Sequence, residues 1–235
     1  MSVLKKIKFS VVALSLTMVF TACSSDDDTT TVPGQGNLKI AAKASYGNSL
    51  KKGAENNVTL TKFLVNFKEI ELELQEGFYD SDDDIKLKGP FEIDLLSGNS
   101  IQLIDIKIPN GIYEEIEFDF DKSENATSEL FGKSMKLTGE INGKAFVFWH
   151  DFEEEIEVDY EDVNQKLVID DNTKEVIIDF DLNAVLAMVD LSTATDNDGD
   201  GLITISPKDL DGNNALAAAL KKAIKEQIEL MDDLD

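Results

Sequence analysis

The sequence contains no arginine, one cysteine, one histidine and four prolines in 235 residues. All 22 basic residues are lysines, and 47 acidic residues oppose them, so the formal charge is −25. We expect no nucleic-acid partner, because such binding depends on neutralising phosphates with Lys and Arg. The lack of Arg also removes the usual bidentate ligand for carboxylate and phosphate groups. The acidic surface should attract cations and repel anionic membrane, or serve solubility alone.

The scarcity of cysteine and histidine limits the available chemistry. With one cysteine no disulfide can form within the chain, so packing, with or without a metal, must hold the fold. His150 is the only histidine, which excludes a histidine-rich zinc site. It precedes Asp151, but neighbours on a strand face opposite ways, so a structural imidazole is expected rather than a catalytic base. Paired carboxylates could cleave a glycoside, yet among 47 acids that pattern is unspecific, and we predict no catalytic residue.

Residues 1–22 have the pattern of an export signal. A lysine-rich start precedes the apolar run Val11–Phe20, which is too short to span a bilayer as a helix. The segment ends in Phe20-Thr21-Ala22-Cys23, which resembles a bacterial lipobox. That resemblance implies that Cys23 is lipidated and becomes the mature N-terminus; an ordinary cleaved signal is the alternative. Removal of the three signal lysines leaves 19 against 47 acids, a formal charge of −28.

The stretch after Cys23 indicates where in the cell the protein is located. Ser24-Ser25-Asp26-Asp27-Asp28 resembles the acidic export signal of Bacteroidetes lipoproteins, which implies an outer-membrane lipoprotein facing the cell exterior; a solvated acidic spacer is the alternative. Residues 23–36 are polar and lack apolar periodicity, so we expect a flexible tether with a reach of roughly 20 Å. The expected partners are the membrane, through the lipid, and an extracellular glycan or protein.

Apolar and acidic residues alternate over most of residues 37–191, as in Glu115–Phe120. One apolar and one acidic face is typical of half-buried antiparallel strands, and short strands with frequent turns indicate a mainly β fold, an antiparallel β-sandwich. The pattern shifts phase at Lys68-Glu69, which predicts a bulge, and Asn142-Gly143 predicts a type I′ hairpin. We expect strands over residues 37–44, 59–67, 69–75, 84–88, 91–96, 101–108, 115–120, 134–141, 144–152, 155–160, 165–170 and 176–181.

Two segments have helical patterns. Asn183 is the expected N-cap of a short helix over Ala184–Val189. Asn213 or Asn214 is the expected cap of an amphipathic helix over residues 215–231. One stripe of that helix is apolar and should pack on the sandwich; a partner-binding helix is the alternative. The stripe consists of Leu216, Leu220, Ile224, Ile228 and Met231.

The segments LTKFLVNFKEIELE, PFEIDLLSGNSIQLIDIKIPNGIYEEIEFDFD and KEVIIDFDLNAVL occur in this order. They resemble a domain-of-unknown-function family of bacterial lipoproteins, over roughly residues 37–190. The resemblance implies an immunoglobulin- or prealbumin-like sandwich. It implies no activity and no catalytic residue.

Residues 192–235 contain the pattern that most specifically indicates a ligand-binding site. Asp196-Asn197-Asp198-Gly199-Asp200-Gly201 matches the first half of an EF-hand-type calcium loop, in which alternate carboxylates bind the ion and the glycine permits a sharp turn. The expected ligands are Asp196, Asp198, Asp200 and the carbonyl of Leu202. The twelfth position is Pro207 instead of a bidentate Glu, so Asp209, Asp211 or Asp190 must contribute, with Asp209 preferred. We expect weak calcium binding, with a Kd on the order of 10⁻⁴ M; a solvated Asp/Gly turn is the alternative.

A second acidic cluster, Asp80–Asp84, lacks the glycine of such a loop and is expected to be a solvated hairpin tip. Taken together, these patterns predict a non-enzymatic, outer-membrane-anchored lipoprotein that binds or organises an extracellular partner and has one weak calcium site. The alternatives are a carboxylate-dependent glycan hydrolase and an accessory subunit of an outer-membrane transporter.

Overall fold

The chain forms two β-sheets whose apolar faces pack together, a mainly β, sandwich-like fold, as predicted. The computed structural model describes residues 34–47, 58–75, 84–160 and 166–232, and Pro33–Asp235 form one compact unit. Cys23, the signal and most of the expected tether lie outside the described residues, so these assignments stay predictions. Neither described helix has both the length and the apolarity that a membrane span requires.

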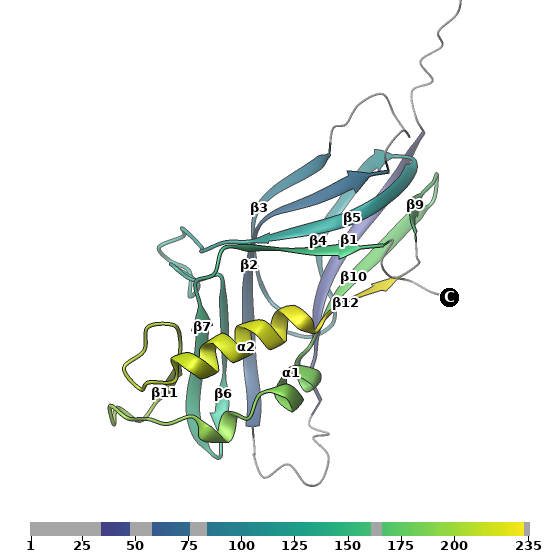
Figure 1. Ribbon diagram of the computed structural model, residues 1–235. Coiled ribbons are helices and arrows are strands. Elements are labelled where there is room, and N and C mark those ends of the chain that lie inside the picture. The colour runs from purple at the N-terminus through teal and green to yellow at the C-terminus, as the bar shows by residue number, and fades with distance from the viewer. Residues whose placement is uncertain (1–33, 48–57, 76–83, 161–165, 233–235) are drawn as a thin grey trace, which may run out of the picture. The chain divides into compact units, whose positions relative to one another are not determined.

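One sheet has four strands in the order β12-β10-β1-β4 (Figure 1). The pair β1–β10 is parallel, and the pairs β1–β4 and β10–β12 are antiparallel. The sandwich expected from the sequence was antiparallel, so the parallel pair at the centre of this sheet departs from the prediction. The strand bounds are β1 Gln35–Ser45, β4 Ile101–Pro109, β10 Thr173–Asp181 and β12 Ile228–Asp232.

The other sheet has eight strands and is built around one long strand, β2 (Val58–Leu74). The first half of β2 pairs with β6 and the second half with β5, and the register shifts between Phe67 and Glu69. This shift confirms the predicted bulge at Lys68-Glu69. The remaining strands are β3 Ile85–Asp94, β5 Gly111–Phe120, β6 Met135–Ile141, β7 Lys144–His150, β8 Glu154–Asp159, β9 Leu167–Ile169 and β11 Ile203–Ile205.

Local sequence explains two features of the strands. Asn142 (φ 53°) and Gly143 (φ 80°) form the two-residue turn between β6 and β7, which confirms the hairpin. At the other end of the chain, β1 begins at Gln35, within the segment expected to be a tether. A Cβ on Gly36 would lie 1.9 Å from the Asp170 carbonyl oxygen. Gly36 therefore permits close packing of two backbones rather than chain flexibility.

The core between the sheets is rich in aromatic side chains. Phe63 and Phe67 of β2 lie with their ring centroids 5.6 and 6.5 Å from that of Phe180 on β10. All three side chains are buried. Because β2 and β10 belong to different sheets, these contacts join the two layers, and each aromatic pair contributes about 0.5–1.5 kcal/mol beyond its buried area.

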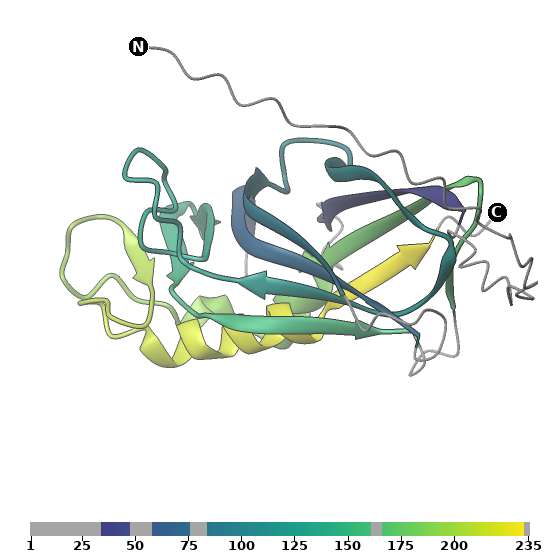
Figure 2. The ribbon, with the colours of Figure 1, turned by 90° about the horizontal axis from the view of Figure 1, so that it is seen from above.

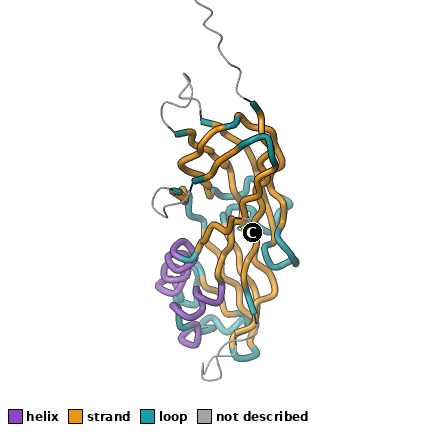
Figure 3. Tube along the Cα trace, turned by 90° about the vertical axis from the view of Figure 1, so that its right-hand side faces the viewer, coloured by secondary structure: helices purple, strands orange, loops and turns teal. Residues whose placement is uncertain are grey.

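Both helices lie on the same side of the strands (Figures 2 and 3). Helix α1 spans Leu182–Met188, the 3₁₀ turn η1 spans Leu191–Thr193, and α2 spans Asn214–Glu226. Helix α2 buries one face and contacts α1, β7 and β11. The buried residues of α2 are Ala217, Leu220, Ala223 and Ile224.

Two helix predictions are wrong in detail. The C-terminal helix ends at Glu226 instead of residue 231, because Ile228–Asp232 pair with the open edge of β10 as β12. Pairing with this edge outweighs the helical periodicity of the segment. The cap of α1 is Asp181, which accepts from the Ala184 amide at 3.0 Å. Asn183 instead accepts from the Gly47 amide and donates to the Ser45 carbonyl.

Candidate metal centre

The Asp196–Gly201 loop connects η1 to β11, and its own carboxylates fold it. Asp196 accepts from the Gly199 amide (2.9 Å) and Asp198 from the Asp200 amide (3.0 Å). Gly199 and Gly201 have φ values of +76° and +92°, a region that favours glycine. The D-x-D-x-D-G pattern therefore specifies the tight turn locally, as expected.

The side chains of Asp196, Asp198 and Asp211 converge beside this loop, with carboxylate oxygens within 4.8 Å of one another. Asp211 is only 1% exposed. It accepts from the amides of Thr204 (2.8 Å), Asn197 (2.8 Å) and Asp198 (3.1 Å). These hydrogen bonds lower the pKa of Asp211 below its ordinary value, and the bond from Thr204 has the largest effect. A charged carboxylate is thus fixed at the base of the loop.

The other expected ligands lie in different surroundings. Asp200 accepts from the Leu202 amide at 2.8 Å and is not one of the three converging carboxylates. Asp209, which was preferred over Asp211, accepts from the amides of Ser206 (2.7 Å) and Asn213 (3.0 Å) and likewise lies outside the group. Asp190 accepts from the Ser192 amide at the start of η1. Of the three candidates for the missing ligand, the structure brings Asp211 to the loop.

Asn213 has a structural role in this centre that was not expected from its position in the sequence. It precedes α2 and was expected to cap it, but its side chain makes no capping bond. Its amide group instead accepts from the Thr195 amide (3.1 Å) and donates to the carbonyls of Thr195 (2.8 Å) and Thr204 (2.7 Å). Asn213 therefore joins both ends of the loop to the start of α2.

This arrangement has the chemistry of a hard-cation site. Calcium takes six to eight oxygen ligands, and the carboxylates must be ionised to bind it. Three carboxylates give part of that shell, and backbone carbonyls and water would have to supply the rest. Asp198 is exposed and Asp196 is half-buried, so the group is open to solvent on one side. Such an open, incomplete shell is typical of a weak site.

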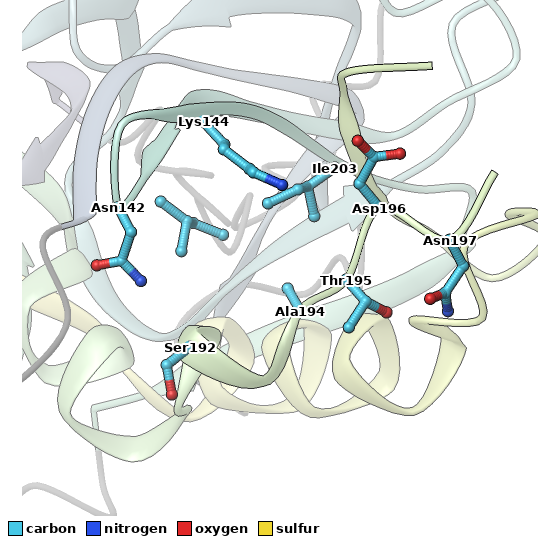
Figure 4. A pocket seen from close by; sticks show the side chains of 9 residues that line it. Asn142, Lys144, Ser192, Ala194, Thr195, Asp196, Asn197 and Ile203 are labelled. Atoms are coloured by element: carbon cyan, nitrogen blue, oxygen red, sulfur yellow. The ribbon is translucent and has the colours of Figure 1, made fainter. Parts of the chain in front are cut away.

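A cavity of about 380 Å³ borders the loop. Ile141 and Ile203 contribute apolar surface, and Lys144, Asp196 and Asn197 contribute polar groups from the β6–β7 hairpin and the loop (Figure 4). Asp196 thus belongs both to the converging carboxylates and to the cavity wall. A change in the loop would alter this cavity.

A second group of acids covers the outer side of the eight-stranded sheet. Cross-strand registers align the acids of β2 with those of β5, and those of β5 with those of β8. The rows are Glu73-Glu115-Asp159, Glu71-Glu117-Glu157 and Glu69-Asp119-Glu155. We call these nine residues the acidic face. Oxygens of Glu115, Glu117 and Glu157 also lie within 4.8 Å of one another.

The acidic face differs from the loop in its electrostatics. Burial, followed by the charge of Glu157, raises the pKa of Glu115 to about 7. Burial likewise raises the pKa values of Glu117 and Glu73. Lysines beside the acidic face contact the two rows that do not contain Glu115. Lys86 lies 2.6 Å from Glu71, and Lys68 lies 2.9 Å from Asp119. Glu115 is therefore partly protonated at neutral pH.

His150 lies among aromatic and charged neighbours. Its ring contacts that of Phe152 edge-on, with centroids 5.4 Å apart, and its Nδ1 lies 3.9 Å from Asp151. Asp151 itself accepts from Lys208 at 2.8 Å. Burial and nearby Lys221 lower the pKa of His150, which keeps the imidazole neutral at physiological pH. These surroundings suit the structural role expected for His150.

Of the Asp80–Asp84 cluster, only Asp84 lies within the described residues. Burial raises its pKa, and the neighbouring Glu71 adds to this shift. The solvated hairpin tip remains a prediction.

The comparisons with known proteins add no relative. No family model matches the chain, and neither the curated proteins nor the solved structures contain a significant match. The family resemblance of the three segments therefore stays a prediction.

Proposed function

We propose that the protein is a non-enzymatic module anchored to the outer membrane by a lipid on Cys23, and that calcium stabilises it at the loop Asp196–Gly201. The convergence of Asp196, Asp198 and Asp211 carries the calcium assignment. The lipobox-like segment and the acidic stretch after it support the anchor and the exterior location.

Calcium at this position would have a structural effect. Asp211 connects the loop to β11 through the Thr204 amide, and Asn213 connects both to α2. An ion bound by Asp196, Asp198 and Asp211 would fix the segment between η1 and α2. That segment leads into α2 and β12, so the ion would stabilise the attachment of the C-terminal region to both sheets.

Thermal melting of the chain from residue 23 onward, with Cys23→Ser, tests the calcium assignment. At 100 times a Kd on the order of 10⁻⁴ M, calcium should add about 2.7 kcal/mol and raise Tm by several degrees relative to EDTA. Magnesium should have a smaller effect because it requires near-ideal octahedral geometry. Asp198→Ala should abolish the calcium effect.

Asp170→Ala is the matched control, because Asp170 also accepts a hydrogen bond from a backbone amide in a turn, that of Asn172 at 2.8 Å. This variant should retain the full calcium effect. An unchanged Tm in the parent chain, or an equal rise in Asp198→Ala, would refute the calcium site.

The anchor is tested separately in cells. Cys23→Ala should move the protein from the membrane fraction to the soluble fraction, and protease added to intact cells should degrade the unsubstituted protein. Membrane association that survives Cys23→Ala would contradict lipid anchoring, and protection from protease would contradict the exterior location.

A further inference from the structure

The two open sheets leave several strand edges without a partner among the described residues. The four-stranded sheet ends in β4 and β12, the eight-stranded sheet ends in β8 and β11, and β3 pairs only with β2. An edge strand presents unpaired backbone N–H and C=O groups that can accept another strand unless charge, proline or short length prevents it.

Four of these edges carry such protection. β11 has only three residues, and β12, with five, carries two acids and no base, so a second copy of β12 would offer no opposite charge. β8 carries Glu155, Glu157 and Asp159, so a second copy of β8 would oppose acid with acid. β3 is interrupted by Pro90, which has no backbone N–H to donate.

Strand β4 is different. It has nine residues, and its only proline, Pro109, stands at its end. The register with β1 skips Leu103, so the regular part is Ile104–Ile108. This part contains one acid and one base, Asp105 and Lys107, both exposed. Within its own sheet Asp105 accepts from Asn37 at 2.8 Å and lies 4.0 Å from the ammonium of Lys39, both on β1, whereas Lys107 makes no ion pair within the described ranges.

Symmetry restricts how β4 can pair with a second copy of itself. In an antiparallel pair the residue on the two-fold axis lies opposite its own copy. An axis at Asp105 or Lys107 would place like charges opposite each other, and an axis at Ile104 would bring Leu103 of the bulge into the pair. An axis at Ile106 places Asp105 opposite Lys107 twice. The same register places Ile104 opposite Ile108.

We propose that β4 pairs with β4 of a second copy, antiparallel and with the two-fold axis at Ile106. The two four-stranded sheets would become one continuous sheet. The strand contact is small, so the dimer should be weak, with a Kd on the order of 10⁻⁵–10⁻⁴ M. This pairing depends on neither the lipid nor calcium, and it goes beyond the function proposed above.

Sedimentation velocity of the Cys23→Ser chain from residue 23, at roughly 5–500 μM and physiological salt, tests the dimer. These concentrations span the expected Kd. Lys107→Asp should weaken dimerisation about tenfold or more, because it replaces two attractive cross-strand pairs with two repulsive ones. The double variant Asp105→Lys/Lys107→Asp should restore dimerisation, because it exchanges the charges without losing the pair.

Lys88→Asp is the matched control for net charge. Lys88 is exposed on β3, a different edge, and makes no ion pair within the described part of the chain, so this variant should dimerise as the parent does. Circular dichroism shows whether each variant is folded. A parent chain that stays monomeric at about 500 μM overturns the proposal, as does equal weakening by Lys88→Asp and Lys107→Asp.

Disulfide trapping provides a second measurement. Opposite Cα atoms in an antiparallel pair are about 4.5–5.5 Å apart, within the range for a disulfide. With Cys23→Ser the chain has no other cysteine, so Ile106→Cys should form a covalent dimer on oxidation. Gln102→Cys, exposed on the same strand, should not, because its copy lies far along the partner strand. Equal trapping of both variants would contradict the register.

Discussion

The three converging carboxylates of Asp196, Asp198 and Asp211, which we call the loop group, and the acidic face contain the same chemical groups at the same spacing, yet they have opposite electrostatics. In each, three carboxylates lie within 4.8 Å of one another. In the loop group, backbone amides donate to Asp211 and lower its pKa. On the acidic face, burial and acids in neighbouring positions raise the pKa of Glu115 to about 7. Hydrogen bonds from backbone amides favour the ionised form of a carboxylate, whereas burial and neighbouring acids favour its protonated form, so two groups with the same spacing differ in their readiness to bind a cation.

The largest expected effect comes from removing Asp211, the side chain of the loop group that accepts hydrogen bonds from three backbone amides. Asp211→Ala removes the acceptor of three part-buried hydrogen bonds from backbone amides, and a hydrogen bond to a charged group contributes about 1.5–3 kcal/mol. We expect a loss of about 3–5 kcal/mol in the free energy of unfolding, measured by urea denaturation in EDTA. Asp211→Asn keeps one acceptor oxygen and should lose less. Equal losses in the two variants would show that the hydrogen bonds from the backbone amides to residue 211 do not explain the stability of this region.

A smaller effect of opposite sign is expected on the acidic face. Glu115→Gln removes a charge while keeping the size of the side chain. It should stabilise the fold at pH 8 by about 1–2 kcal/mol, after allowance for solvent screening of this partly exposed group. Urea denaturation at pH 8 measures the change. A destabilised variant would mean that the Glu115 carboxylate has a stabilising partner.

The raised pKa of Glu115 also fixes the sign of its pH dependence. Its value is about 7 in the fold and about 4.5 in the unfolded chain. Between these values the folded state binds more protons, so the contribution of Glu115 to stability rises as pH falls from about 8 towards 4.5. Tm should therefore increase on mild acidification, and less so in Glu115→Gln. A parallel pH profile of the two proteins would contradict the assignment.

At lower pH the loop group should dominate. The pKa of Asp211 is lowered below its ordinary value of 3.8, so its stabilising contribution is present above that value and is lost as pH falls through the lowered pKa. The two regions together predict a stability maximum in the mildly acidic range. Asp211→Asn should reduce the loss of stability below pH 4 without changing the rise between pH 8 and 5.

The smallest effect tests a cation beside the acidic face. Lys86 contacts Glu71 at 2.6 Å, and its side chain is 51% exposed. Lys86→Gln should lower Tm by no more than about 2 °C, because exposed ion pairs contribute little. Lys144→Gln, which removes an exposed lysine without an ion pair in the described residues, is the control. A large fall in Tm would show that Lys86 offsets much of the repulsion on the face.

Features that depend on neighbours along the chain were predictable from the sequence. The Asn142-Gly143 turn, the bulge in β2 and the tight loop Asp196–Gly201 each follow from a few adjacent residues. Each expected strand overlaps an observed strand, because alternating burial leaves a clear period of two. However, residues 59–67 and 69–75 form one strand, β2, and residues 84–88 and 91–96 form one strand, β3.

Features that depend on distant segments were not predictable. The choice between Asp209 and Asp211 depends on how the chain returns from β11 to α2, which spacing alone does not determine. Residues 228–232 keep a helical period, but the free edge of β10 draws them into the sheet. The acidic face requires the order of β2, β5 and β8 and their registers. Each strand alone indicates only a solvated acidic side.

Direct calcium titration by calorimetry tests the central comparison, using the Cys23→Ser chain from residue 23 together with its Asp198→Asn and Glu117→Gln variants. These two substitutions remove one charge from the loop group and one from the acidic face. We expect one weak site that is lost in Asp198→Asn and retained in Glu117→Gln. Binding that survives Asp198→Asn but is lost in Glu117→Gln would contradict it, because calcium would then bind on the acidic face.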